Sequence, residues 1–503
     1  MTWAELHGVL RGRGLIRADA APQAEAAVGA VTGIAYDSRA VAPGEVFVGL
    51  KGLHADGASF ARQAIDRGAV AVVSDQPAPA GVRVPWALVD NARLALAVLA
   101  AEFFHHPSRE MKVIGITGTN GKTTTAYVLA SIFDAAGVPC GVLGTVSYRI
   151  GAEVREATRT TPEAPDVQRL LREMVDRGCG ACTMEVSSHA LSLSRVDGMT
   201  FAAGVFTNLT RDHLDFHADM DAYFRAKRRL FEMLPADAPS LINLDDPRGA
   251  SLVGAGGTPT TYAISRPADL TTGPLSFSLD GLSFDIRSPR GTMRIESKLV
   301  GRPNVYNILA AAATATALGL PLDAIERGVR ALDGVPGRFQ VVSGANDEVT
   351  VVVDYAHTDD ALRNLLETAR PLARGRLITV FGCGGDRDRT KRPLMGAVAG
   401  RLSDLIIVTS DNPRSEDPAR IIEEIQRGIT QDTRRDAGQL LAIVDRAAAI
   451  AKAVEVARPG DLVLVAGKGH EKYQVIGDRT LPFDDVAVAR EALGRRRSHS
   501  GAA

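Results

Sequence analysis

A glycine-rich turn that contains a lysine and several hydroxyl groups carries the clearest chemical signal in this sequence. Residues 115–125 read GITGTNGKTTT and follow the apolar run KVIGI. Backbone N–H groups in such a turn and at the start of the next helix can bind phosphate oxygens, Lys122 can reach the terminal phosphates, and the Thr123 hydroxyl can ligate magnesium. Because Ile116 replaces the first glycine of G-x-x-x-x-G-K-[ST], this is a variant phosphate loop, and ATP is its expected ligand. A tight turn with a solvated lysine is the alternative.

Two further polar motifs follow apolar runs. Glu185 ends CTMEV and precedes a Ser-Ser-His run, so its carboxylate is expected at the carboxyl edge of a strand, beside hydroxyl groups. A helix cap after the strand would also explain this spacing. His213, in NLTRDHLDFH, lies between two aspartates, and taken alone it is an ordinary loop histidine.

Lys227 falls on the apolar face of a predicted helix. In MDAYFRAKRRLFEML, residues 220–234, the apolar positions recur at helical spacing, and Lys227 shares their face. An isolated buried ammonium group is costly, so this lysine must be paired, modified or able to extend to solvent. Extension to solvent from the edge of the stripe is the simpler explanation.

An arginine follows another predicted strand, in the segment DNPRSEDP at residues 411–418. The guanidinium of Arg414 presents a planar pair of donors that matches a carboxylate. Locally, Asp-Asn-Pro is also a common turn, and the residues after Arg414 are typical of a helix start. The glycines of GCGGDRD, residues 382–388, lack the G-x-G-x-x-G spacing, so no dinucleotide site is predicted there.

The elements that must position these motifs predict an α/β protein of about three domains, because the chain has 503 residues and a domain typically has roughly 100–200. Short apolar runs separated by turns indicate a small α/β unit over residues 1–108. The polar segment FFHHPSRE, which ends at Glu110, is the expected linker. A second unit ends near Pro336, and a third covers residues 337–503.

Within the second unit, β-branched runs alternate with helices expected from Lys122, at 167–177 and at 220–234. A hairpin is expected around Asp280-Gly281, and a helical pair at 304–332. In the third unit, VTVVVDY, RLITVFG, DLIIVTSD and DLVLVAGKG are each expected to precede a helix. Ligands bind at the carboxyl ends of such strands, which is where the motifs lie.

Composition and charge exclude several classes of protein. The formal net charge is −1, from 58 basic and 59 acidic residues, so no global field would recruit nucleic acid or an anionic membrane. No apolar run approaches the roughly 18 residues of a membrane helix, and the N-terminal residues do not resemble a signal peptide. The four cysteines are too few for a disulfide framework, and Cys179 and Cys182 lack partners for a zinc site. A cytoplasmic protein is expected.

Taken together, the motifs resemble the Mur ligase family and its folylpolyglutamate synthetase relatives. The resemblance extends over almost the whole chain. It rests on YDSRAVAPGEVFV, HADG, GTNGKTTT, TTPE, MEVSSHAL, FTNLTRDHLDFH, GRPNVYN, VPGRFQ, DYAHTDDAL, GCGGDRDRTKRPLM, DNPRSEDP and GKGHE. It implies a three-domain Mur ligase architecture: a UDP-sugar-binding domain at 1–108, a central P-loop-type ATPase domain at 109–336, and a Rossmann-like amino-acid-binding domain at 337–503. It also implies a monomer that uses ATP and Mg²⁺.

The resemblance implies that the chain ligates meso-diaminopimelate to the D-glutamate of UDP-N-acetylmuramoyl-L-alanyl-D-glutamate in peptidoglycan synthesis. Amide synthesis from a carboxylate in water needs activation, and phosphorylation by ATP gives an acyl phosphate that an amine can attack. Cations must offset the repulsion between the anions that meet there. Lysine-adding relatives lack an arginine at position 414, so Arg414 favours diaminopimelate.

The resemblance also assigns roles to individual residues. Arg338 is expected at the ATP phosphates, Asp354 at the ribose, and Asn304 and Asn307 near the adenine; taken singly, each could be a turn or capping residue. The phosphate-loop contacts are Gly118, Thr119, Asn120, Gly121, Lys122, Thr123 and Thr124. The expected catalytic residues are Lys122, Glu185, His213, Lys227 and Arg338. The magnesium ligands are Thr123, Glu185, His213 and Lys227, the last as a carbamate.

Two substrate sites follow from the same resemblance. The UDP-sugar dipeptide is expected at Ser38, His54, Thr160, Thr161, Ser187 and Arg195. Diaminopimelate is expected at Arg392, Asp411, Asn412, Pro413, Arg414, Gly467 and Glu471, with Glu471 suited to an ammonium group. Leu193 stands where many members of the family have a glutamine, which puts one contact to the dipeptide in doubt.

Two other functions remain open at this point. The first is a related amide ligase that adds lysine or forms folylpolyglutamate; DNPR and the N-terminal DSR segment weigh against both. The second is a noncatalytic nucleotide-binding switch, which explains neither an inward Lys227 nor the pairing of Glu185 with His213.

Overall fold

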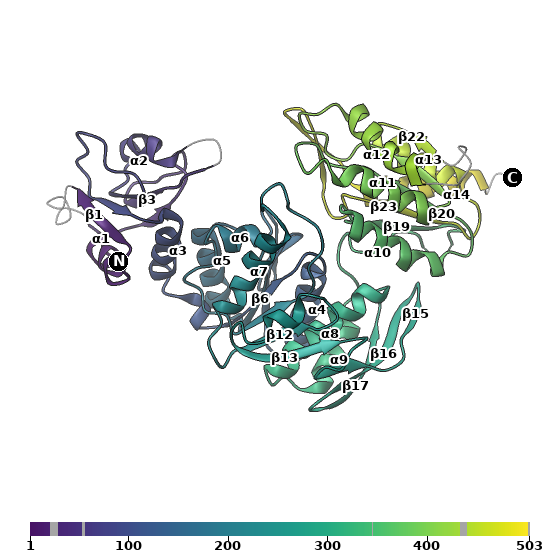
Figure 1. Ribbon diagram of the computed structural model, residues 1–503, viewed down its shortest axis with the longest axis horizontal. Helices are drawn as coiled ribbons and strands as arrows, with labels where there is room; N and C mark the ends of the chain where they lie inside the picture. The colour runs from purple at the N-terminus through teal and green to yellow at the C-terminus, as the bar shows by residue number, and fades with distance from the viewer. Residues whose placement is uncertain (21–28, 53–55, 345, 433–439, 501–503) are drawn as a thin grey trace.

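Three α/β units make up the protein, each built around its own β-sheet (Figure 1). The computed structural model describes residues 1–20, 29–52, 56–344, 346–432 and 440–500. In Figure 1 the N-terminal unit (purple) lies at the upper left, the central unit below it, and the C-terminal unit (green to yellow) at the upper right. This arrangement confirms the predicted α/β fold.

The N-terminal unit has a sheet in the order β1-β5-β4-β3-β2, in which only the β1–β5 pair is antiparallel. Helix α3 begins after Asn91, whose side chain accepts hydrogen bonds from the first-turn N–H groups and so caps the helix. The strands are β1 (Ile16–Ala20), β2 (Gly33–Ala35), β3 (Glu45–Gly49), β4 (Ala71–Ser74) and β5 (Trp86–Val89), and the helices are α1 (Trp3–Gly12), α2 (Ala61–Asp66) and α3 (Ala92–Phe103).

The central sheet has a parallel core with antiparallel extensions at both edges. Strands β7, β10, β6, β11, β12 and β13 are parallel neighbours, and β6 lies between β10 and β11. One edge continues into β8 and β9, and the other into β14 to β17. The strands are β6 (Lys112–Thr117), β7 (Cys140–Leu143), β8 (Ser147–Ile150), β9 (Glu153–Glu156), β10 (Ala181–Glu185), β11 (Ala203–Phe206), β12 (Pro239–Asn243), β13 (Thr258–Ala263), β14 (Leu270–Thr272), β15 (Ser276–Ser278), β16 (Gly281–Ser288) and β17 (Gly291–Ser297).

Except for α6 (Ser188–Ser192), which was not predicted, the helices of this unit match those that the sequence predicts to within a few residues. They are α4 (Lys122–Ala135), α5 (Ala164–Asp176), α6 (Ser188–Ser192), α7 (Met220–Glu232), α8 (Arg302–Ala317) and α9 (Leu322–Ala331). The hairpin expected around Asp280-Gly281 is the β15–β16 pair, in which Ser278 is the partner of Gly281.

The C-terminal sheet has the order β18-β19-β23-β20-β21-β22 and is parallel except for β18. Side chains of β19 alternate between the two faces: Val352 packs with α10, α11 and α12, whereas Val351 and Val353 pack with α13 and α14. The strands are β18 (Gln340–Val341), β19 (Thr350–Asp354), β20 (Leu377–Phe381), β21 (Leu405–Val408), β22 (Leu440–Ala442), β23 (Leu462–Ala466), β24 (Tyr473–Ile476) and β25 (Arg479–Pro482). The helices are α10 (Asp359–Ala369), α11 (Lys391–Leu402), α12 (Pro418–Asp432), α13 (Arg446–Val456) and α14 (Asp485–Ser500).

One prediction for this unit is wrong. The run DLVLVAGKG does not lead directly into a helix, because the antiparallel β24–β25 hairpin comes between β23 and α14.

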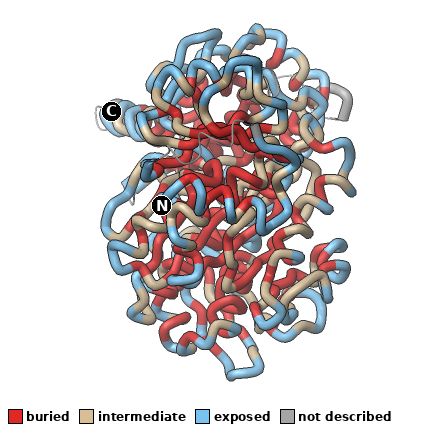
Figure 2. Tube along the Cα trace, turned by 90° about the vertical axis from the view of Figure 1, so that its left-hand side faces the viewer, coloured by how far each residue is buried: buried red, intermediate tan, exposed pale blue. Residues whose placement is uncertain are grey.

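The sheet order places the carboxyl ends of β19, β20, β21 and β23 along one edge, where the predicted amino-acid motifs follow them. Figure 2 shows buried residues concentrated along the interiors of the units and exposed residues in the connecting turns. Within the described residues, no helix combines the length and apolar composition that crossing a membrane requires.

The helix that carries the phosphate loop is held by a close helix–helix contact. Helix α9 packs on α4 where Gly328 faces the backbone of Ile132, and a Cβ at position 328 would lie 2.5 Å from the Ile132 Cα. The Ser131 hydroxyl donates a hydrogen bond of 2.7 Å to the Gly328 carbonyl at the same crossing. The absence of a side chain at position 328 therefore allows the two helices to approach.

Replacing Gly328 with alanine is expected to destabilise the protein by about 1–3 kcal/mol, because the added methyl group would force the α4 and α9 backbones apart. Urea unfolding monitored by circular dichroism measures this change. Gly334→Ala is the matched control, since a Cβ there meets nothing within 4 Å. Equal stability of the two variants would contradict the role given to the Gly328 contact.

Candidate active site

The phosphate loop joins β6 to α4, and two glycines shape it. Gly118 and Gly121 have φ angles of 149° and 86°, a region that favours glycine. A Cβ at Gly118 would lie 1.8 Å from the Thr207 hydroxyl, and one at Gly121 would lie 2.3 Å from the Asn307 side-chain oxygen. Thr207, which follows β11, and Asn307 of α8 therefore lie directly against the loop, and neither glycine has room for a side chain.

Two lysines converge on one carbonyl of this loop. The Nζ atoms of Lys122 and Lys227 lie 2.9 Å and 2.7 Å from the Gly118 oxygen. Lys227 is only 1% exposed, which confirms the burial predicted from its place on the helix face. Burial and the nearby Lys122 ammonium hold the pKa of Lys227 well below its ordinary value. Both effects favour the uncharged amine of Lys227 over its ammonium form.

Burial also lowers the pKa of Lys122, but Glu185 and Asp212 oppose this shift. The carboxylate of Glu185 is 1% exposed and lies across from the loop. It accepts hydrogen bonds from the Thr123 hydroxyl at 2.9 Å and from the N–H of Thr145 at 2.8 Å. The two oxygens of Thr123 and Glu185 form a buried donor pair of the kind that hard divalent cations prefer.

His213 lies on the other side of Lys227. Its backbone is left-handed, with φ at 54°, and its ring centroid is 5.9 Å from that of Tyr223, the ring over which the Lys227 amine sits. Burial lowers the pKa of His213, so its imidazole is neutral and offers a lone pair. The structure thus places His213 and Lys227 against the same tyrosine.

The C-terminal unit contacts the phosphate loop directly. Arg338 donates a hydrogen bond of 3.1 Å to the Thr123 hydroxyl, and its guanidinium lies 4.6 Å from the centroid of the Tyr355 ring. Asn120 donates one of 3.0 Å to the carboxylate of Asp360. Arg338 Nε is buried and has no hydrogen-bond partner among the described residues, so it remains available to a ligand.

The other residues predicted to bind the nucleotide lie around the same loop, and their side chains form hydrogen bonds within the protein. Asn307 donates to the Asn304 side chain at 2.9 Å, and Asn304 donates to the Val300 carbonyl at 2.8 Å. Asp354 accepts hydrogen bonds from two backbone N–H groups that follow Arg338 and Tyr355. Thr119 and Thr124 are buried within the loop and the first turn of α4.

Four of the residues predicted to bind the dipeptide lie together beside Glu185. Thr161 donates to the Glu185 carbonyl at 2.8 Å, and the Ser187 N–H donates to the Thr161 hydroxyl at 3.1 Å. Arg195 reaches the Thr161 carbonyl at 3.1 Å. The fourth is Thr160, whose hydroxyl lies 3.0 Å from that of Thr145.

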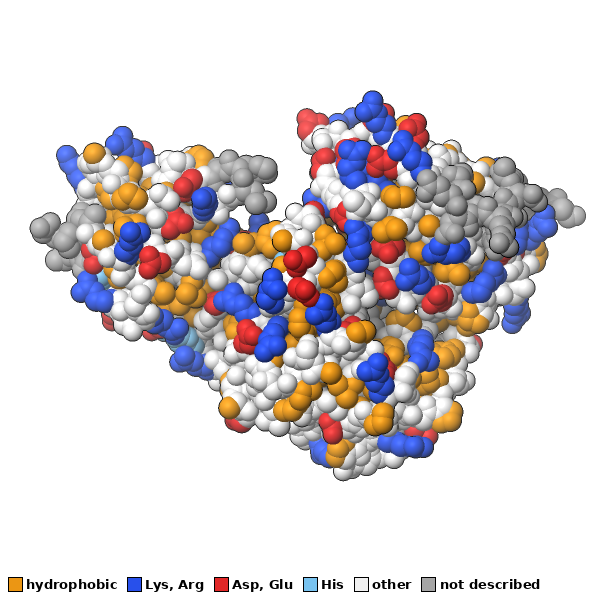
Figure 3. Space-filling model, viewed as in Figure 1, with side chains coloured by type: hydrophobic (Ala, Val, Ile, Leu, Met, Phe, Trp, Pro, Cys, Tyr) orange, Lys and Arg blue, Asp and Glu red, His pale blue; other side chains and the backbone are white. Residues whose placement is uncertain are grey.

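The N-terminal unit joins this group through residues that the sequence analysis did not select. The Tyr36 hydroxyl donates to Asp166 at 2.7 Å across the boundary. Arg93 of the N-terminal unit lies 3.8 Å from the carboxylate of Glu163, which itself forms an ion pair of 2.8 Å with Arg195. Ser38 hydrogen-bonds within its own unit, to Gln63 at 2.9 Å. His54 lies outside the described residues. Figure 3 shows an open notch between the N- and C-terminal units, above the central unit.

At the edge of the C-terminal sheet, the predicted amino-acid residues form one cluster. Asn412 donates to Glu471 at 2.9 Å, and a Cβ at Gly467 would lie 2.5 Å from an Asp411 carboxylate oxygen. Lys468, which the sequence analysis did not select although it lies within GKGHE, is fully buried between Asn412 and Glu471 at 3.0 Å and 2.9 Å. Its position between two acceptors could not be inferred from spacing alone.

The guanidinium groups of Arg414 and Arg392 differ in how many of their donors already have a partner within the protein. Arg414 has a left-handed backbone, with φ at 51°, and one guanidinium nitrogen donates to the Gly385 carbonyl at 2.8 Å. Arg392 is 0% exposed and is paired with Glu416 and Glu424, each at 2.8 Å. Only its Nε lacks a partner among the described residues. Arg392 mainly supports the loop that follows Pro413 and Arg414, because ion pairs occupy most of its donors.

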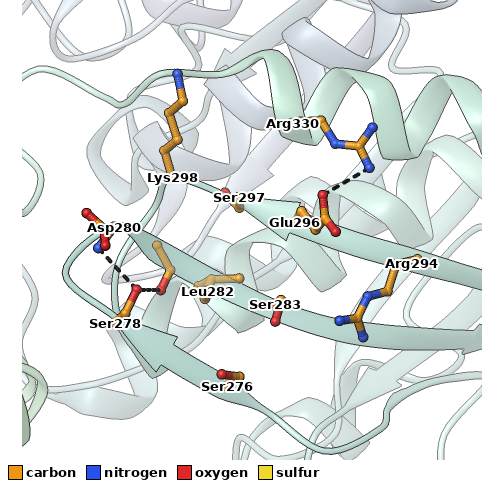
Figure 4. A pocket seen from close by; sticks show the side chains of 11 residues that line it. Ser276, Ser278, Asp280, Leu282, Ser283, Arg294, Glu296, Ser297, Lys298 and Arg330 are labelled. Carbon is orange, nitrogen blue, oxygen red and sulfur yellow. Dashed lines mark hydrogen bonds and ion pairs between the residues drawn. The ribbon is translucent and has the colours of Figure 1, made fainter.

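A hollow of about 400 Å³ lies elsewhere, on the β15–β17 sheet at the outer edge of the central unit (Figure 4). Its three basic side chains, Arg294, Lys298 and Arg330, are each within ion-pair distance of a carboxylate. Because several strands separate β15 from β6, this hollow is not part of the site.

Cys179 and Cys182 are buried free thiols. Within the described parts of the chain, no group of three or more His, Cys, Asp or Glu side chains lies close enough together to hold a metal ion.

Comparison with known proteins accounts for this arrangement. Family models match three segments: "Mur ligase family, catalytic domain" at 30–104, "Mur ligase middle domain" at 116–315, and "Mur ligase, glutamate ligase domain" at 337–469. A curated UDP-N-acetylmuramoyl-L-alanyl-D-glutamate–2,6-diaminopimelate ligase from Geobacter metallireducens is 50% identical over 488 residues, which cover 93% of this chain and 95% of that one. The chain belongs to the Mur ligase family.

Other Mur ligases resemble the chain over comparable lengths. The diaminopimelate ligase of Solibacter usitatus is 49% identical and covers 92% of this chain and 93% of its own. A solved diaminopimelate ligase structure superposes with a TM-score of 0.68 at 34% identity, over 99% of both chains. A MurF ligase of Thermotoga maritima, solved with ADP, has a TM-score of 0.63 at 19% identity over 92% of this chain and 98% of its own, and so shares the fold.

Replacing Lys122 with alanine is expected to lower turnover by about 10²- to 10³-fold or more, because the ammonium group in the phosphate loop would no longer offset phosphate charge. Phosphate release from ATP measures the change. Lys112→Ala, an exposed lysine at the start of β6, is the control and should retain full activity. Turnover by the Lys122 variant within tenfold of the unaltered protein would contradict this role.

Proposed function

We propose that this chain ligates meso-diaminopimelate to the D-glutamate of UDP-N-acetylmuramoyl-L-alanyl-D-glutamate and converts ATP to ADP and phosphate. The observation that carries the proposal is the 50% identity to a diaminopimelate ligase over nearly the full length of both chains. The geometry supports it: the phosphate loop, the Thr161–Ser187–Arg195 group and the Asp411–Glu471 cluster belong to units in direct contact.

In the first step, an oxygen of the substrate carboxylate forms a bond to the γ-phosphorus while the bond to the β–γ bridging oxygen breaks, giving an acyl phosphate and ADP. Lys122 offsets negative charge on the phosphates from the loop, and Arg338 does so from the C-terminal unit. The contact of Arg338 with Thr123 supports this placement, because Thr123 is the loop hydroxyl nearest Glu185. Lys122 contacts the Gly118 and Thr119 carbonyls and Arg338 contacts the Thr123 hydroxyl, so both cations lie against the same loop.

In the second step, the amine nitrogen attacks the acyl carbon, the C–O bond to phosphate breaks, and the nitrogen loses a proton. Asp411 and Glu471 are suited to an ammonium group of the amino acid. We propose that Arg414 binds the carboxylate that diaminopimelate has and lysine lacks. Asn412, Pro413, Gly467 and the Nε of Arg392 complete the proposed amino-acid site.

The residues present fit a magnesium ion. Thr123 and Glu185 offer two buried oxygens 2.9 Å apart, and magnesium usually takes only one or two protein ligands and receives the rest from phosphates and water. When bound, the ion would offset phosphate charge. We propose that His213 and Lys227, the latter as a carbamate, serve a second ion.

A carbamate at Lys227 is chemically favoured by its surroundings. A neutral amine attacks CO₂, an N–C bond forms while one C=O π bond opens to C–O⁻, and the nitrogen loses a proton, so a carbamate anion that attracts Lys122 replaces the uncharged amine. The shared Gly118 carbonyl supports this proposal because it brings the two amines together. An ammonium group at Lys227 would not react in this way.

The other substrate contacts are proposed from the positions described above. Ser38, His54, Thr160, Thr161, Ser187 and Arg195 are proposed to bind the UDP-sugar dipeptide, and Asn304, Asn307 and Asp354 the nucleoside of ATP. We also propose domain limits of 1–108, 109–336 and 337–503, a monomer, and a cytoplasmic location. The three sheets support the limits, because no sheet crosses them.

The decisive assay is phosphate release from ATP and Mg²⁺ with UDP-N-acetylmuramoyl-L-alanyl-D-glutamate, with meso-diaminopimelate compared to L-lysine as the amine. Release is expected with diaminopimelate and at least about tenfold less with lysine, because lysine cannot pair with Arg414. Preference for lysine would leave a ligase but overturn the specificity. No release with either amine would overturn the proposed function.

Arg414→Ala is the matched variant for the same assay. Its KM for diaminopimelate should rise by about tenfold or more, while its KM for ATP stays within about twofold, because the lost ion pair concerns only the amine. Comparable increases for both substrates would contradict the role of Arg414.

A further inference from the structure

The β24–β25 hairpin has an unusual distribution of buried side chains. Tyr473 and Ile476 of β24 are exposed, and the residues of β25 are exposed or half-buried. Gln474 is the only fully buried residue of the hairpin. A two-stranded hairpin without an apolar face is marginal on its own, so other contacts must hold it in place.

Those contacts go to the loop that carries Arg414. The Gln474 amide donates to the Asp411 carbonyl at 2.7 Å, and the Val475 N–H donates to the Asn412 side chain at 2.9 Å. Arg414 itself pairs with the hairpin as a strand would: its N–H donates to the Val475 carbonyl at 3.1 Å, and its carbonyl accepts from the Gly477 N–H at 2.7 Å. The hairpin therefore holds three of the four residues from 411 to 414.

The backbone of Arg414 explains why such a hold is needed. A φ of 51° is a left-handed conformation that residues other than glycine rarely adopt, and it persists only where neighbouring contacts fix it. In an extended conformation the side chain of Arg414 would point elsewhere. The two backbone hydrogen bonds to Val475 and Gly477 fix the residue on both sides of its Cα.

We propose that the β24–β25 hairpin is a specificity-setting element and that Gln474 is a positioning residue for the amino-acid substrate, acting through the 411–414 loop and Arg414. This inference rests on the proposed function, in which Arg414 binds the second carboxylate. Gln474 does not itself touch the substrate. Its buried amide orients the start of the loop, while the backbone of the hairpin orients the end.

Gln474→Met keeps the length of the side chain but removes the donor, leaving the Asp411 carbonyl unpaired. The KM for diaminopimelate should rise about tenfold, as expected when a buried carbonyl loses its partner. The kcat and the KM values for ATP and the UDP-sugar dipeptide should stay within about twofold. Thr480→Ala, an exposed position on β25 opposite Val475, is the control and should leave all constants unchanged.

A double-variant cycle with Arg414→Ala tests the route of the effect. If Gln474 acts through Arg414, adding Gln474→Met to Arg414→Ala should raise the KM for diaminopimelate by less than about twofold further. If the effects of the two substitutions on the KM for diaminopimelate multiply, or if the KM for ATP rises by the same factor as that for diaminopimelate, the proposal would be overturned. Should Gln474→Met fold poorly, Gln474→Ala admits water to the carbonyl and should raise the same KM less steeply.

The two hypotheses fail in different ways. If the unaltered protein releases no phosphate with diaminopimelate, the proposed function and this inference both fall. If it is active and Gln474→Met behaves like Thr480→Ala, only the inference about the hairpin falls.

Discussion

Much of the site depends on one carbonyl oxygen, that of Gly118, which two lysine amines share at 2.9 Å and 2.7 Å. Two ammonium groups so close together in a buried site repel each other, which favours loss of charge from one of them. The charge of Glu185 supports the ammonium of Lys122, which remains suited to phosphates, whereas burial and the Lys122 charge favour the uncharged form of Lys227. The left-handed glycines of the loop make this arrangement possible, since neither position has room for a Cβ.

The central and C-terminal units meet at the phosphate loop. The central unit brings the phosphate loop and Glu185 together, since β6 and β10 are adjacent parallel strands. The C-terminal unit adds Arg338 from the segment that leads into β18 and carries the amino-acid cluster at its own sheet edge. Contacts of Asn120 with Asp360 and of Arg338 with Thr123 join the two edges. Activation of the carboxylate and delivery of the amine can therefore occur over one substrate.

The sequence predicted those features that depend on local patterns. Helical spacing located Lys227 on a buried face, and strand–turn–helix order located the phosphate loop. It did not predict contacts that depend on which strands become neighbours, such as Lys468 between Asn412 and Glu471, or Glu163 beside Arg195. The β24–β25 hairpin was missed because its residues lack an apolar period; only Gln474 is buried. The ion pairs of Arg392 were not predicted either, because its place in the first turn of α11 gives no sign of the two glutamates that enclose it.

The central claim is that the buried Lys227 amine, which shares the Gly118 carbonyl with Lys122, becomes a carbamate anion. Carbon-13 NMR of the protein equilibrated with ¹³C-bicarbonate tests this directly. One slowly exchanging carbamate signal per chain should appear, should vanish in Lys227→Met, and should persist in Lys452→Met, a lysine exposed on α13. Absence of the signal from fully active protein, or its persistence in Lys227→Met, would contradict the claim.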